Sequence, residues 1–218
     1  VFWVFNDAGN LHTETGGGQF GIEVHAMAYS FIDSGHVNNI TFYDYTLINR
    51  SDREYHDTYI GVFTDIDLGE ASDDFVGFDV DRKMAYGYNG DAFDDLPNGY
   101  GADLAMIGIQ MNKAPYLDNG AESEMHNSTH LTSTFFGDPY GTPSISFEYY
   151  NFLKGLDEFG SPRLSSQGDT VLHTYPDSPN EGGESMCNTG INAGEYKTLM
   201  SFGPVTLSAG DKNSFSYS

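Results

Sequence analysis

Apolar and polar residues alternate along much of the chain, which is the pattern of β-strands that bury one face. The longest strands are predicted over Gln19–Ile32, Asn39–Asn49 and Asp57–Asp67. In the first of them, five apolar residues from Phe20 to Ala28 fall on alternate positions. Shorter strands are predicted at residues 83–89, 103–111, 131–136, 144–153, 197–203 and 204–210.

Turn signals separate these segments, as at Asp33-Ser34-Gly35 and Asn98-Gly99. No stretch predicts a helix longer than two turns, and the best short candidate is Glu148–Leu156. About ten strands at these spacings favour an all-β fold, a mostly antiparallel β-sandwich with long loops, as a single domain over residues 1–218. Residues 157–195 are poor in apolar groups and rich in glycine, proline and serine, which predicts one long surface excursion.

The charge of the chain excludes two classes of partner. It has 32 acidic and nine basic residues, a formal net charge of −23. Nucleic acids and anionic membranes are bound by clustered lysine and arginine, so neither is an expected partner. The sequence has no run of about 20 apolar residues, so we expect no segment of it to insert into a membrane. The single cysteine, Cys187, cannot form an internal disulfide, and its neighbours offer no cationic group to activate it.

Both ends of the sequence bear on its origin. The sequence begins at Val1 and ends inside the strand-like segment NSFSYS. We therefore expect a fragment of a longer secreted protein, with any export signal upstream. An acidic chain without a disulfide framework fits an extracellular or cell-surface location if metal ions stabilise it.

The strongest chemical signal is an acidic segment between Asp65 and Asp95, which holds ten carboxylates and only two basic residues, Arg82 and Lys83. Crowded carboxylates repel one another until protons, water or a cation relieve the repulsion. Oxygen ligands on a loop bent at Gly69 favour Ca²⁺, whereas Zn²⁺ would need histidine or cysteine. The predicted ligands of one or two Ca²⁺ ions are Asp65, Asp67, Asp73, Asp74, Asp79, Asn89 and Asp91, with Asp94 as a further candidate.

This segment does not have the spacing of an EF-hand. Counted from Asp65, position six is Glu70 where the EF-hand has glycine, and position twelve is Val76 where it has glutamate. The alternative is an acidic surface that is simply solvated.

Other chemistries have weaker signals. His126 and His130 are four residues apart but lie in a loop-and-strand pattern without the glutamate of a zinc protease motif. Nucleophilic catalysis lacks a GxSxG motif, and pairs of carboxylates are unavoidable in so acidic a chain. Aromatic residues are numerous enough for a carbohydrate-binding platform, although most are expected in the core or in cross-strand pairs. The candidates for the platform are Trp3, Tyr86, Tyr88, Tyr100, Tyr116, Tyr140, Tyr149 and Tyr150.

An ordered set of motifs resembles a recurring module of large secreted proteins of the Bacteroidota, which often carry a sorting domain for type IX secretion. The motifs are GIEVHAMAYSF, NNITFYDYTLINRS, DTYIGVFTDIDLG, DDFVGFDVDR, MAYGYNGD and LMSFGPVTLSAGD. The resemblance covers residues 19–110 and 196–218. It implies that carboxylates at the positions of Asp65, Asp67, Asp73, Asp74, Asp79 and Asp91 recur in the module, and it implies no enzymatic activity.

Together these features predict a non-catalytic, calcium-binding structural or adhesive module of an extracellular or cell-surface bacterial protein. Its expected partners are glycans or neighbouring domains of the same chain. The alternatives are a carbohydrate-binding module, a polysaccharide-degrading hydrolase or lyase, and a self-associating subunit of a surface filament. The last rests on open strand edges expected at both ends of the chain.

Overall fold

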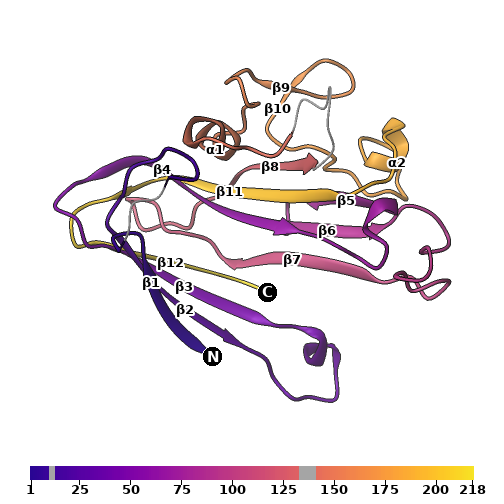
Figure 1. Cartoon of the computed structure of the whole chain (residues 1–218), viewed down its shortest axis with the longest axis horizontal. Coiled ribbons are helices and arrows are strands. Elements are labelled where there is room, and N and C mark those ends of the chain that lie inside the picture. Colours follow the sequence, from indigo (N-terminus) through magenta and orange to yellow (C-terminus); the bar gives the residue numbers. More distant parts are fainter. Residues whose placement is uncertain (10–12, 133–140) are drawn as a thin grey trace. The chain divides into compact units, whose positions relative to one another are not determined.

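The computed structural model describes residues 1–9, 13–132 and 141–218, and its ordered elements are mostly antiparallel strands (Figure 1). The helical elements of these residues are α1 Ser146–Leu153, α2 Met186–Thr189 and the 3₁₀ segments η1 His36–Asn39 and η2 Ala71–Asp73. The strands are β1 Phe2–Asn6, β2 Ile22–Tyr29, β3 Phe42–Asn49, β4 Tyr55–Asp65, β5 Asp74–Asp79, β6 Met84–Asn89, β7 Met106–Lys113, β8 Met125–Thr132, β9 Arg163–Leu164, β10 Thr170–Val171, β11 Tyr196–Leu207 and β12 Lys212–Tyr217.

The strands form three sheets. The largest has the order β1-β2-β3-β12-β7-β6-β5, a second has the order β4-β11-β8, and β9 pairs with β10. The pairings β1–β2, β2–β3, β3–β12, β7–β12 and β5–β6 are all antiparallel. The prediction of an all-β, antiparallel, sandwich-like fold is therefore confirmed.

Contacts within the chain divide it into two compact units. The first contains residues 1–60, 110–124 and 202–218, and the second contains residues 61–109 and 125–201. Strands β4, β7 and β11 each have residues in both units. The whole acidic segment from Asp65 to Asp95 lies in the second unit, which is therefore the one that matters for the predicted metal site.

The first unit uses many of its aromatic residues in cross-strand pairs. Tyr45 of β3 stacks on Phe215 of β12 with ring centroids 5.0 Å apart and planes 6° apart. Tyr43 stacks on Tyr217 in the same pair of strands, and Trp3 of β1 meets Tyr45 edge-on. Such pairs stabilise a sheet, so these rings already have a structural use.

The first and last strands, β1 and β12, differ in their position in the sheet: one lies at its edge and the other does not. β1 is the edge of the largest sheet, whereas β12 lies between β3 and β7 and pairs with both. The expectation of an open strand edge at the C-terminal end of the sequence is therefore wrong. β12 pairs with β3 along its whole length and with β7 through Ser216 and Tyr217, so it is not an edge strand of the sheet.

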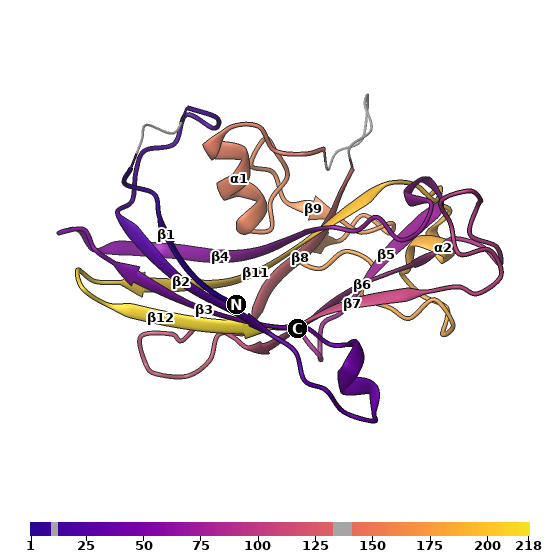
Figure 2. The same cartoon turned by 60° about the horizontal axis from the view of Figure 1, so that its bottom comes forward.

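The second unit has a core of apolar residues from several elements. Val76 and Phe78 of β5 are fully buried, and Leu131 of β8, Phe152 of α1 and Leu199 of β11 form a buried cluster. Figure 2 shows α1 beside β8 and β9. The acidic segment therefore contains a strand, β5, that is anchored in the core of this unit.

The prediction of a strand over residues 144–153 is wrong at most positions, because residues Ser146–Leu153 form the helix α1. The side chain of Glu148 accepts hydrogen bonds from the backbone N–H groups of Ser144 and Ile145, at 2.7 and 3.3 Å. A carboxylate that caps the first turn offsets the strand preference of the aromatic residues. In the part of the chain that the structure describes, no helix is long and apolar enough to cross a membrane.

Other predicted boundaries also shift. The segments 197–203 and 204–210 belong mainly to one strand, β11, which continues through a cis peptide bond at Gly203-Pro204. Residues 74–79, expected in an acidic loop, form strand β5. The segment 131–136 contributes only its first two residues to β8, and the rest lies outside the described residues.

The expected excursion at residues 157–195 is not wholly on the surface. It contains β9, β10 and α2, and it buries the side chains of Arg163 and Met186. Arg163 donates hydrogen bonds to the side-chain oxygen of Asn127 at 3.2 Å and to the carbonyl of Phe152 at 3.4 Å. These contacts attach the segment to β8 and α1.

Candidate metal centre

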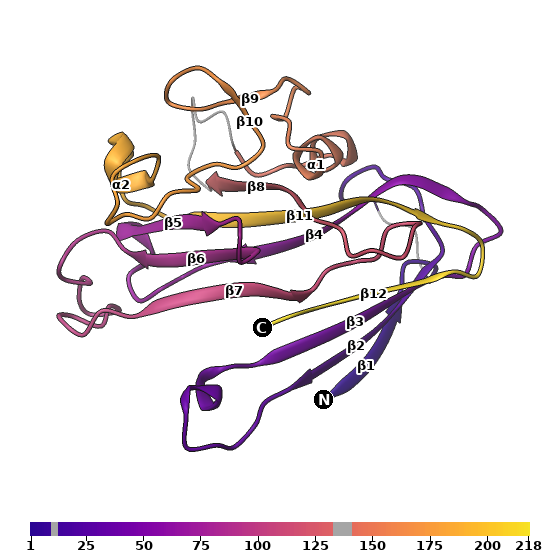
Figure 3. The same ribbon diagram turned by 180° about the vertical axis from the view of Figure 1, so that it is seen from behind.

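The fold gathers the start of β5 and the end of β6 into one acidic region of the second unit. β5 and β6 run side by side (Figure 3), and Asp74 is opposite Asn89 in their antiparallel register. Asp73 is the last residue of η2 and directly precedes Asp74. The backbone carbonyl of Asp73 accepts a hydrogen bond from Gly90 N–H at 2.7 Å. Asp73, Asp74 and Asn89 therefore lie within a few ångströms of one another along the backbone.

Three side-chain oxygens in this region are buried and have no hydrogen-bond donor among the described residues. They are Oδ1 of Asp73, Oδ1 of Asp74 and Oδ1 of Asn89. Asp74 has no exposed surface, and Asn89 is 8% exposed. A buried acceptor without a donor costs on the order of 1–3 kcal/mol, more when it is charged, so a proton, a water molecule or a cation at these oxygens would stabilise the region.

The pKa of Asp74 reflects its buried and acidic surroundings. Burial raises its pKa to about 7 against the hydrogen bond from Leu68 N–H, and the carboxylates of Asp73, Asp94 and Asp67 raise it further. Burial likewise raises the pKa of Asp73, opposed by a hydrogen bond from Asp95 N–H. A bound divalent cation would reverse both effects because it favours the charged carboxylates.

Asp94 is a buried carboxylate whose place in the site the sequence left open. It is 1% exposed, and its two oxygens accept hydrogen bonds from Glu70 N–H at 2.9 Å and Tyr100 N–H at 2.8 Å. A Cβ atom at Gly69 or Gly99 would lie 2.0 or 2.1 Å from an Asp94 oxygen. Asp94 therefore joins two loops. Gly69 and Gly99, which leave room for its side chain, were the feature of the sequence that could have identified Asp94 as a buried residue.

Two further predicted ligands lie at the rim of the region. Asp91 Oδ1 accepts hydrogen bonds from Phe93 N–H at 2.8 Å and from the side-chain amide of Asn89 at 3.4 Å. Asp67 is exposed and close enough to Asp74 to raise its pKa. Neither forms with Asp73 and Asp74 a group whose carboxylate oxygens all lie within 4.8 Å of one another among the described residues, so both lie outside the buried set.

Asp65 belongs to a different group of acidic side chains. Asp65, Asp67 and Glu195 each offer an oxygen, and these atoms lie within 4.8 Å of one another. The ammonium of Lys197 already lies 3.0 Å from Asp65 and 3.2 Å from Glu195. We regard the buried group as the better metal site because this exposed group has a protein cation. Glu195 was missed because it is 130 residues away along the chain from Asp65.

The structure separates Asp79 from the other predicted ligands. It is at the opposite end of β5 from Asp74, about 16 Å away for a strand of this length. Its carboxylate forms an ion pair and hydrogen bonds with Arg82. Burial favours a higher pKa for Asp79, but these bonds outweigh burial and lower the pKa below its ordinary value.

The donor set of the buried region suits calcium. Asp73, Asp74 and Asn89 would hold the ion through their buried oxygens. Ca²⁺ takes six to eight oxygen ligands at 2.3–2.6 Å, so backbone carbonyls or water would complete the shell. The weaker zinc candidates already have hydrogen-bond partners: His126 donates to the carbonyl of Lys154, and His130 shares a hydrogen bond with the hydroxyl of Thr174.

No model of a known protein family matches the chain, and no curated protein sequence matches it. The resemblance to secreted Bacteroidota modules therefore stays a prediction, and the function is argued from the site.

Replacement of Asp65 with asparagine tests the distinction between the two acidic groups. We expect Asp65→Asn to leave the calcium affinity within about twofold of the wild type, since Lys197 neutralises that group. The unfolding free energy should fall by less than about 1 kcal/mol, the usual value of an exposed ion pair. Calcium titration and chemical denaturation measure the two quantities. A loss of calcium binding in this variant would move the site to Asp65, Asp67 and Glu195.

Proposed function

We propose that this chain is a non-catalytic, calcium-stabilised β module of an extracellular or cell-surface protein, with a structural or adhesive role. The observation that carries the proposal is the set of three buried, donorless oxygens on Asp73, Asp74 and Asn89. Such a set is costly without a cation and becomes a ligand set with one.

A calcium ion at this position would connect segments that are distant in sequence. Asp73 ends η2, Asp74 begins β5 and Asn89 ends β6. Leu68 N–H and Asp95 N–H bind oxygens of Asp74 and Asp73, so the loops on both sides of the strand pair are attached to the same carboxylates. Neutralising these carboxylates would stabilise both loops together.

The extracellular assignment rests on the supply of calcium and on the charge of the chain. Extracellular calcium is commonly millimolar, which saturates a site of micromolar affinity. The same module would be less stable in a cell interior, where free calcium is scarce, and would become rigid after export. The net charge of −23 supports the attraction of cations and keeps the module soluble.

Direct calcium titration tests the proposal. After removal of metal with EDTA and exchange into metal-free buffer, isothermal titration calorimetry should show one or two Ca²⁺ bound per chain with micromolar affinity. Asp74→Asn should weaken that binding at least about 100-fold because it removes an inner charged ligand. Asp79→Asn is the matched control, an aspartate on the same strand that faces Arg82, and should bind calcium like the wild type. Equal binding by the wild type and Asp74→Asn would refute the site.

The hydrolase or lyase alternative needs a carboxylic acid that can donate a proton near neutral pH. Among the acidic residues that line the groove described below, Asp79 has a lowered pKa and so stays ionised. The filament alternative needs open strand edges for self-association, and of the two terminal strands only β1 lies at the edge of its sheet. Neither alternative has an observation that favours it over the calcium module.

A further inference from the structure

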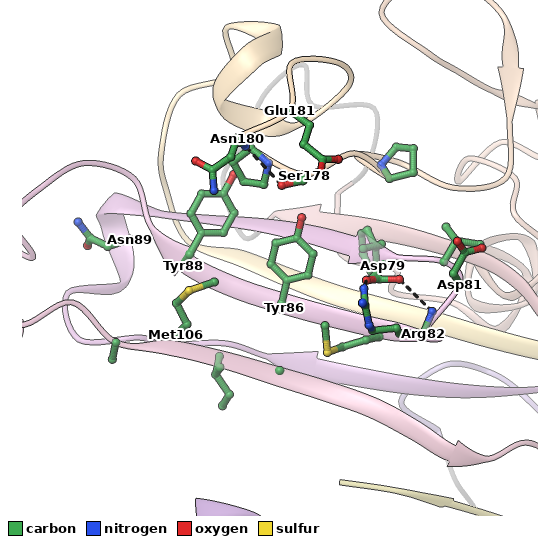
Figure 4. Close-up of a pocket in the computed structure, with 18 of the residues that line it drawn as sticks. Asp79, Asp81, Arg82, Tyr86, Tyr88, Asn89, Met106, Ser178, Asn180 and Glu181 are labelled. Carbon is green, nitrogen blue, oxygen red and sulfur yellow. Dashed lines mark hydrogen bonds and ion pairs between the residues drawn. The ribbon is translucent and has the colours of Figure 1, made fainter. Parts of the chain in front are cut away.

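A groove in the second unit lies beside β5 and β6 and has a volume of about 1100 Å³ (Figure 4). Its floor includes Tyr86 and Tyr88 of β6 and Met106 of β7, and its opposite wall is the segment 176–181. Ligand pockets are commonly 300–1,000 Å³, so this groove has room for an extended ligand.

Tyr86 lies flat at the centre of the floor. Its cross-strand partner is Gly77 of β5, and a Cβ atom at Gly77 would lie 2.4–2.8 Å from the phenol oxygen and ring carbons of Tyr86. The ring therefore covers the β5 backbone with one face, in space that any side chain at Gly77 would fill. Its other face is available to the groove, which it lines.

Tyr88 continues this aromatic surface along the strand. Its ring centroid is 5.9 Å from that of Tyr86, with the planes 33° apart. The hydroxyl of Tyr88 is buried and lies beside Cys187. Two tyrosines at alternate positions of one strand face the same side of the sheet, so a chain-like ligand could contact both.

Polar groups surround the aromatic floor. Asp81 and Glu181 are exposed carboxylates at the groove, and Asn180 and Ser178 add an amide and a hydroxyl. The pictured side chains of Glu181 and Asn180 lie above the two tyrosines, and Asp81 lies toward one end (Figure 4). Carboxylates accept hydrogen bonds from hydroxyl donors, and those to a charged group are the stronger ones.

We propose that this groove binds a neutral oligosaccharide whose sugar rings stack on Tyr86 and Tyr88 and whose hydroxyl groups donate to Asp81 and Glu181. A pyranose has one apolar face of C–H groups and a rim of hydroxyls, which matches a flat aromatic floor with acceptors at its edge. Carboxylates at the rim and a chain charge of −23 repel uronate and sulfated glycans. This site is additional to the calcium module. Of the three residues with buried, unpaired oxygens in the calcium proposal, Asn89 also lines the groove, as does Asp79, which pairs with Arg82.

Affinity electrophoresis and calorimetry in calcium-containing buffer test this proposal on the whole chain. The probes are neutral polysaccharides (β-glucan, mannan, xylan and α-glucan), the anionic polysaccharides alginate and polygalacturonate, and a hexalysine peptide. We expect binding to at least one neutral polysaccharide and to neither anionic one. Binding to hexalysine alone would identify a cationic peptide site and overturn the proposal, as would binding to none of the neutral probes.

Variants locate the binding in the groove. Tyr86→Ala should weaken the affinity for the bound polysaccharide about tenfold, and Tyr86→Phe should retain it because the ring remains. Glu181→Gln, an exposed change that leaves folding intact, should also weaken it about tenfold. Tyr149→Ala on α1 is the matched control, an exposed tyrosine outside the groove, and should bind like the wild type.

Unchanged affinity in both Glu181→Gln and Tyr86→Ala would overturn the assignment to this groove. Asp74→Asn should weaken calcium binding at least about 100-fold and leaves the floor and rim residues of the groove in place, so failure of one proposal is distinguishable from failure of the other.

Discussion

Removal of calcium with EDTA at pH 7.5 is expected to lower the melting temperature of this chain by about 10 °C relative to 2 mM CaCl₂. An ion that binds only the folded state, at about 1,000 times its dissociation constant, stabilises the fold by roughly 4 kcal/mol. For a chain of 218 residues, each kcal/mol changes the melting temperature by about 2–4 °C. Thermal unfolding followed by circular dichroism or scanning calorimetry measures the difference.

Two controls distinguish site binding from a general effect of salt. The same concentration of MgCl₂ should restore only a small part of the loss, because Mg²⁺ requires a stricter octahedral shell and retains its water. Asp79→Asn should show the full calcium response, since Asp79 faces Arg82 at the far end of β5. A melting temperature that is equal in EDTA and calcium, with both samples folded, would contradict the metal centre.

Asp74→Asn is expected to change stability in opposite directions with and without calcium. In calcium at pH 7.5 the variant should be less stable than the wild type, because it lacks the charged inner ligand. In EDTA it should be more stable by roughly 2–4 kcal/mol, because the buried charge of Asp74 is removed. The asparagine oxygen can still accept the hydrogen bond from Leu68 N–H, which Asp74 accepts at 3.1 Å.

The pH dependence of this difference follows from the raised pKa of Asp74, about 7 in the folded chain against about 3.9 in the unfolded chain. Between these values the folded state holds the proton more firmly, so stability falls as the pH rises. In EDTA the wild type should lose roughly 2–3 kcal/mol relative to Asp74→Asn between pH 5 and pH 7.5.

Burial and the nearby His126 lower the pKa of His173, so His173 makes stability rise with pH and opposes the effect of Asp74. For this reason the measured quantity is the difference between wild type and variant by urea denaturation, in which His173 cancels. A difference that does not change between pH 5 and pH 7.5 would show that Asp74 is not buried among uncompensated charges.

The sequence predicted the β character of the chain well because strand periodicity is local. The strands near residues 22–29, 42–49 and 55–65 follow from alternating side chains that any neighbouring sheet would bury. The helix at Ser146–Leu153 was only partly foreseen, because its cap depends on how Glu148 reaches back to Ser144 and Ile145. Local composition there gives aromatic residues that suit either element.

The candidate site was predicted as one group of acidic residues and was found divided. Asp73, Asp74 and Asn89 come together because β5 and β6 pair in a register that opposes Asp74 to Asn89. The same register places Asp79 at the other end, and the path of β4 and β11 brings Asp65 to Glu195 and Lys197. Sequence spacing records the number of carboxylates but not which end of a strand they occupy.

By itself, the sequence determined that this is an acidic β protein with a concentration of oxygen ligands at residues 65–95, because charge and periodicity are properties of the chain alone. Only the tertiary structure decided which of those oxygens are buried without donors, which carboxylates have Arg82 or Lys197 as partners, and where Tyr86 lies flat on Gly77. The physical reason is that burial and pairing are set by strand register and by contacts between residues far apart in sequence, and these set the cost of each charge.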